Sequence, residues 1–128
     1  MAAKTIAYRI DVLNVVRGTN ITAPPAVYLA AYSALSSDGS SGGTEIAAAT
    51  RQPITFSTAG SSGQIVNTSE LAYPVASSNW GSVVGVGLWS SSGTSGYCFW
   101  TDVMTTAVTI NTNEQFRIST GNVTYQDI

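Results

Sequence analysis

The side chains that could perform chemistry in this sequence are few, and almost all of them are carboxylates. Histidine is absent, which removes the usual general base, the Ser-His-Asp type of triad and the commonest metal ligand. Two facing carboxylates could still hydrolyse a glycosidic bond if they lay about 5–10 Å apart. The candidates are Glu70, Asp102 and Glu114, each alone on a different expected strand or turn. We expect them to be solvated or paired with Arg51 or Arg117, so the sequence predicts no catalytic residue and no enzyme.

Metal and cofactor sites are not indicated either. With one cysteine and no histidine, a zinc site and an internal disulfide are both excluded. The glycine clusters at 39–43 and 60–63 precede no helix pattern and no Gly-Lys-Ser/Thr, so they do not form a phosphate loop. Cys98 has two interpretations: a small apolar residue buried in a strand, which we favour, or a thiol that bridges two subunits.

The composition restricts the partners. Charged residues make up 9% of the 128 residues, against about a quarter in an average protein. The five basic residues form no stripe that could neutralise nucleic-acid phosphates. No apolar run reaches the roughly 18 residues of a membrane span, and no signal peptide follows Met1. A surface with so little charge is typical of a protein covered by its neighbours in an assembly.

One helix is predicted, over residues 3–17. One apolar stripe is formed by residues that recur at spacings of four and three: Ile6, Ile10, Leu13 and either Val16 or Val15. Gly18 then provides the usual glycine stop. Because a helix of about four turns is marginal alone, it must dock on its own domain or on a neighbouring subunit.

The rest of the chain reads as strands. The apolar residues alternate in short segments separated by Gly, Ser and Asn turns, and residues 36–45 form a surface loop rather than a calcium site. This pattern predicts an all-β, antiparallel, two-sheet β-sandwich of the jelly-roll type. We expect a single domain, 1–128, with the sandwich at 26–126. The expected strands number about eight: 26–33, 51–57, 63–74, 80–89, 97–103, 108–110, 116–119 and 123–126.

Residues 80–100 contain all three tryptophans and are predicted to form a central hairpin. Three side chains are expected to face inward: Val84, Val86 and Leu88. Gly85 and Gly87 leave room for an aromatic ring or a neighbouring chain across the strand. Trp89 and Trp100 are the rings most relevant to a partner, because aromatic side chains dominate both cores and interfaces. We favour core or interface over an exposed binding platform.

Four motifs carry a family resemblance. LNVVRGTNITAPPAVYLAAYS (13–33) and GGTEI (42–46) with Arg51 come first, then WGSVVGVGLW (80–89) and TTAVTINTNEQFRISTGNVT (105–124). In this order they resemble a family of small virion proteins of tailed phages, often labelled tail fibre proteins. The likeness spans about residues 10–125. It departs at Ala107, where the family often has proline, and at 113–114, where Asn-Glu stands for Gly-Asp.

The resemblance implies a non-enzymatic virion protein that is made in the bacterial host cytoplasm. Within that class we favour a capsid decoration protein, because the chain is one compact domain without repeats or heptads. It would bind the major capsid protein or other virion proteins as a homo-oligomer, with a trimer favoured. The candidate interface is Ile6, Ile10, Leu13, Trp89 and Trp100. The alternative is a tail fibre or tail-tip component that binds a receptor or glycan.

Overall fold

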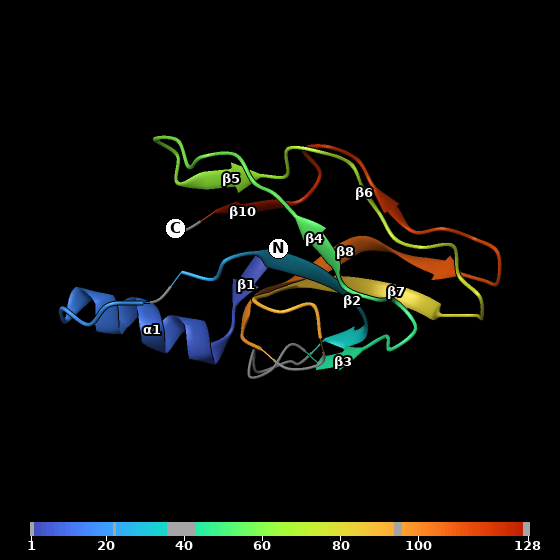
Figure 1. The fold of residues 1–128 in the computed structure, drawn as a ribbon, viewed down its shortest axis with the longest axis horizontal. Helices are drawn as coiled ribbons and strands as arrows, with labels where there is room; N and C mark the ends of the chain where they lie inside the picture. The colour runs from blue at the N-terminus through green and yellow to red at the C-terminus, as the bar shows by residue number, and fades with distance from the viewer. Residues whose placement is uncertain (1, 22, 36–42, 94–95, 127–128) are drawn as a thin grey trace.

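The computed structural model describes residues 2–21, 23–35, 43–93 and 96–126 (Figure 1). One helix and ten strands lie in these ranges. In chain order they are β1 (Ala2–Lys4), α1 (Ile6–Val16), β2 (Val27–Leu35), β3 (Gly43–Glu45), β4 (Gln52–Ile54), β5 (Gln64–Val66), β6 (Leu71–Ala72), β7 (Gly81–Trp89), β8 (Cys98–Ile110), β9 (Arg117–Ile118) and β10 (Thr124–Gln126).

The predicted fold class is confirmed, because all the strand pairs are antiparallel and form a sandwich-like arrangement. The main sheet has the order β1-β8-β7-β2-β3, with β4 also paired to β2. Two small sheets, β10-β5 and β6-β9, form a second layer (Figure 1). The predicted segment 63–74 divides into β5 and β6, while 97–103 and 108–110 belong to one strand, β8. The predicted loop 36–45 ends in β3, and residues 36–42 lie outside the described ranges.

The core lies between the main sheet and the small sheets. Its largest fully buried side chains include Leu29 and Val83 from the main sheet, and Tyr73 and Tyr125 from the second layer. The Tyr73 hydroxyl donates a hydrogen bond to the Leu29 carbonyl over 2.6 Å, which joins the two layers. Burial raises the pKa of both tyrosines well above the ordinary value, so both phenols are neutral at any physiological pH.

These two tyrosines give a matched pair of predictions. Tyr73→Phe is expected to lower the free energy of unfolding by about 1–2 kcal/mol, because a buried hydrogen bond is lost. Tyr125→Phe is expected to raise it by about 1 kcal/mol, because its buried hydroxyl has no hydrogen-bond partner among the described residues. Urea denaturation measures both. Two changes of the same sign would contradict the assignment.

The central hairpin forms as predicted, since β7 pairs with β8 over almost its whole length. However, the prediction that Val84 faces the core is wrong. Val83 is paired with Val108 and Gly85 with Val103, so Val84 stands opposite four residues of β8. This irregularity shifts the alternation, and the buried side chain is therefore Val83.

The two glycines of β7 are covered by side chains of β2. A Cβ on Gly87 would lie 2.7 Å from Cε1 of the Tyr32 ring, and one on Gly85 would lie 2.6 Å from Cδ1 of Leu35. Both distances are too short for a side chain to be added without movement. The aromatic ring that was predicted to lie across these glycines is therefore found over Gly87, as the Tyr32 ring, whereas Gly85 is covered by the aliphatic side chain of Leu35.

The predicted helix starts three residues too early, because Ala2–Lys4 form β1 on the edge of β8. Thr5 makes the corner between strand and helix: its amide donates to the Phe99 carbonyl over 2.9 Å, and its Oγ1 accepts from the Tyr8 amide over 3.3 Å. This side-chain cap begins the helix at Ile6.

The predicted stop of the helix is confirmed. Gly18 has φ +93° and donates to the Val15 carbonyl, while Thr19 donates to the Asn14 carbonyl. This pair of bonds is the Schellman motif, which ends a helix with a residue of positive φ. Among the described residues, no helix is long and apolar enough to cross a membrane.

Candidate interaction surfaces

The predicted apolar stripe of the helix is exposed. Ile6, Ile10 and Leu13, which we call the α1 stripe, are 40%, 53% and 65% exposed, and α1 has no buried residue. Figure 1 shows why: α1 extends to the left, away from the two layers of strands. Of the two docking options, the chain's own sandwich therefore does not cover the stripe.

A different side of α1 holds the helix to the sheet. Tyr8 packs edge-on against Phe99 at 5.3 Å and against Trp100 at 4.9 Å between ring centroids. Thr5 reinforces this contact, because its hydroxyl donates to the Cys98 carbonyl over 2.5 Å. The base of α1 is thus fixed on β8, while the α1 stripe stays exposed.

Trp89, a predicted interface residue, belongs to a polar cluster within the chain. The Arg51 guanidinium carbon lies 4.0 Å from the centroid of the Trp89 ring, and Trp89 Nε1 donates to the Tyr32 hydroxyl over 2.7 Å. Arg51 also forms a two-pronged ion pair with Glu45, through Nε at 2.9 Å and Nη2 at 2.8 Å, and donates to the Ser91 carbonyl. We call these five residues the Arg51 cluster: Tyr32, Glu45, Arg51, Trp89 and Ser91.

Trp100, the other predicted interface ring, is half-buried against aromatic neighbours. It stacks on Tyr125 with 4.9 Å between centroids and an interplanar angle of 19°. Its edge contact with Tyr8 covers it further. Neither Trp89 nor Trp100 lies free on a concave aromatic face, which is the arrangement that a glycan-binding platform requires.

Cys98 is buried in β8, as the favoured interpretation predicts. Burial raises the pKa of its thiol from 9.0 to about 11, because the thiolate loses its hydration. The sulfur lies 3.6 Å from the Trp100 carbonyl oxygen. A bridge to a second subunit would therefore require β8 to open locally.

This burial predicts slow thiol chemistry. At pH 8, Cys98 is expected to react with Ellman's reagent at least tenfold more slowly in the native protein than in 6 M guanidinium, since only the thiolate attacks. Non-reducing gels of purified particles should accordingly show a monomer band. A native rate equal to the denatured one, or a dimer band that reductant removes, would show an accessible thiol.

The three candidate carboxylates lie in separate contacts. Glu70 pairs with Arg117 at 3.2 Å, and Glu114 Oε1 accepts from the Asn111 amide at 2.7 Å, where it closes a turn. Asp102 lies at the rim of a groove and is partly buried. Among the described residues, no group of three or more Cys, Asp or Glu side chains could hold a metal ion. The geometry thus gives no support to a hydrolytic pair.

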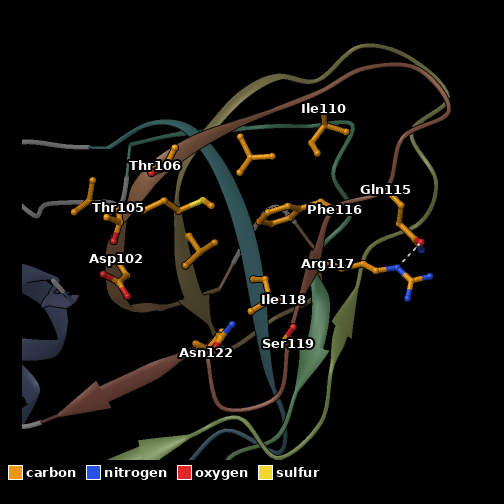
Figure 2. Close-up of a pocket in the computed structure, with 15 residues that line it drawn as sticks. Asp102, Thr105, Thr106, Ile110, Gln115, Phe116, Arg117, Ile118, Ser119 and Asn122 are labelled. Atoms are coloured by element: carbon orange, nitrogen blue, oxygen red, sulfur yellow. Dashed lines mark hydrogen bonds between the residues drawn. The ribbon is translucent and has the colours of Figure 1, made fainter.

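A groove of about 590 Å³ was not predicted from the sequence (Figure 2). One wall is β8 with Asp102, Thr105 and Thr106, and the other is the segment of Phe116 and Ile118. We call it the β8 groove. Residues 103–113 contain no charged side chain, which is the one signal in the sequence that could have indicated it. The groove opens where the two layers of the sandwich separate beside β8.

Comparison with known proteins shows the family of the chain. A search of curated proteins finds none that matches it. A family model described as podophage GP4 fiber I protein gp80 matches residues 5–126, which includes α1, all the described strands except β1, and the β8 groove. The protein therefore belongs to the family of podophage GP4 fiber I protein gp80, a family of structural proteins of the tailed-phage particle.

Proposed function

We propose that the protein is a non-enzymatic fibre subunit of the phage particle, assembled as a homo-oligomer through the α1 stripe. The observation that carries the proposal is the exposure of Ile6, Ile10 and Leu13 on a helix that contacts the sheet through another side chain, Tyr8. The fibre description of the family supports the place of the subunit in the particle.

The occupant of the α1 stripe that fits best is a second copy of the same chain. The stripe is wholly apolar, so two copies can approach without repulsion between like charges. Its spacing of four and three residues is the spacing with which helices pack side by side at a shallow angle. In a closed symmetric oligomer, for which a trimer is favoured, every copy buries the same patch against a neighbouring copy.

A non-enzymatic role fits the distribution of polar groups. The buried polar side chains hold the fold together: Arg51 pairs with Glu45, and Asn67 donates to the carbonyls of Ser69 and Ser119. Two of the carboxylates that could have served in hydrolysis are engaged in separate contacts, Glu70 with Arg117 and Glu114 with the Asn111 amide. Such a subunit acts through shape and buried surface.

Capsid decoration is the second candidate. It is favoured by the compact β body and by a sequence without the internal repeats of an extended fibre shaft. In that role the partner would be the major capsid protein. The two candidates differ in where the protein sits on the particle, which a direct measurement decides.

Gold-labelled antibodies against the purified protein, applied to intact particles, provide that measurement. We expect label on appendages at the tail end of the particle in electron micrographs. Label spread over the head would instead support decoration. The proteins of gradient-purified particles should include this chain by mass spectrometry, and its absence there would overturn both roles.

A further inference from the structure

Strand β8 has an open edge. On one side β8 pairs with β7 on both flanks of the irregularity at residues 104–107, and on the other β1 pairs only with residues 100–102. Within the part of the chain that the structure describes, no strand pairs with residues 103–110 on that second side. We call this stretch the β8 edge. Its outward backbone groups are available to another strand.

Nothing in the sequence of the β8 edge protects it from pairing. Edge strands are usually blunted by lysine, other charges or proline, which prevent another chain from adding to the sheet. Residues 103–110 read VMTTAVTI and contain none of these. Val103, Thr105 and Thr106 are exposed, and valine and threonine favour extended structure. The edge is therefore competent to pair.

The β8 groove runs beside this edge and adds a second, independent feature. Its buried floor is apolar and includes Val86, Ile110 and Phe116, and its exposed rim mixes polar side chains with Val103 and Val108. Figure 2 shows that Arg117 points away from the groove toward Gln115, whose Oε1 accepts from its Nε at 2.8 Å. The floor thus suits uncharged, apolar side chains, and the volume of about 590 Å³ accommodates several of them.

We propose that the β8 edge and the β8 groove receive an extended, uncharged segment of another protein of the phage particle, added as a strand next to β8. In such an addition the backbone hydrogen bonds supply affinity, and pockets for alternate side chains supply specificity. Because side chains of a strand alternate between faces, every second one would enter the groove. That the partner is a particle protein rests on the family assignment.

The same side of β8 already holds one strand next to the β8 edge. β1 pairs antiparallel with residues 100–102, with Ala2 opposite Asp102, and Asp102 is also among the residues that line the β8 groove. The proposed segment would continue that row of strands along β8. Each of the ten described strands is already paired on at least one side, so among these strands a second copy could offer only the edge of a sheet, such as its own β8 edge, and not an extended segment that is free on both sides. This favours a different protein as the donor.

A synthetic peptide can test the proposal on the full chain. The probe is fluorescein-labelled Lys-(Thr-Val)4-Lys, whose valines share one face. We expect saturable binding by fluorescence polarisation, together with at least tenfold slower amide hydrogen exchange within residues 103–110. A peptide of the same composition with four threonines followed by four valines serves as control, and should bind at least tenfold more weakly.

A charge on the edge gives the matched protein variants. Thr106→Lys, on the exposed edge, is expected to weaken peptide binding at least tenfold, whereas Thr58→Lys, in an exposed loop, should not change it. Equal binding to the two variants, or no slower exchange in residues 103–110, would overturn the proposal. Two other results would also overturn it. Slower amide exchange in residues 103–110 on raising the protein concentration alone would assign the β8 edge to a second copy. Slower exchange there on adding maltoheptaose alone would assign the β8 groove to a sugar.

Discussion

Replacing Arg51 with methionine is expected to lower the free energy of unfolding by about 3–5 kcal/mol. The Arg51 side chain is 2% exposed, and its partner Glu45 is 26% exposed. Without the guanidinium, Glu45 loses both prongs of its ion pair, the Ser91 carbonyl loses a donor, and the Trp89 ring loses the cation above it. Urea denaturation of the purified protein measures the change.

Arg117 provides the matched control, because it forms the same kind of ion pair at the surface. Arg117 and Glu70 are 57% and 49% exposed and lie 3.2 Å apart. Since solvent screens such a pair, Arg117→Met is expected to cost less than about 1 kcal/mol. Equal losses for the two variants would show that burial of Arg51 has no special role. Adding Glu45→Gln to Arg51→Met should recover part of the loss, because the unpaired buried charge is then removed.

The Arg51 cluster explains how the central hairpin is held. Glu45 lies on β3, Trp89 ends β7, and Ser91 belongs to the connection that follows. Tyr32 joins the cluster and also covers Gly87, so one set of contacts fixes the far end of β7 and the packing over its glycines. Disruption of this cluster should loosen the β7–β8 connection before it affects the second layer.

The strands and the helix stop could be predicted because they depend on local pattern. Alternating apolar residues marked β2 and β7, and Gly18 marked the end of α1. The pairing of Glu70 with Arg117 agrees with one of the expectations from the sequence, that a candidate carboxylate is solvated or paired with Arg51 or Arg117.

The errors arose where pairing over long sequence distances decides the structure. Ala2–Lys4 suits a helix locally, but it pairs with β8 about a hundred residues away. Val83 replaces Val84 in the core because four residues of β8 stand opposite a single residue of β7, a count that neither strand reveals alone. The β8 groove depends on which edge is left without a partner, so the sequence could show only that 103–113 is uncharged.

The α1 stripe gives the second large effect, which concerns assembly rather than folding. The double variant Ile10→Glu, Leu13→Glu is expected to convert the oligomer to a monomer in light scattering and to abolish incorporation into particles. Both side chains are exposed, so the free energy of unfolding of the isolated subunit should change by only about 0.5 kcal/mol per site. Assembly is expected to fail because two carboxylates would have to be desolvated at the helix contact between copies.

Ala7→Glu is the control, because Ala7 is exposed on the same helix but outside the α1 stripe. It should leave the oligomer and its incorporation intact, and a carboxylate in the first turn also suits the helix dipole. An oligomer that survives the double substitution would exclude the α1 stripe as its interface. A double variant that fails to fold would show instead that the stripe stabilises the subunit itself. The proposal that α1 contacts neighbouring copies is supported only if the double variant is a folded monomer and the particles lack it.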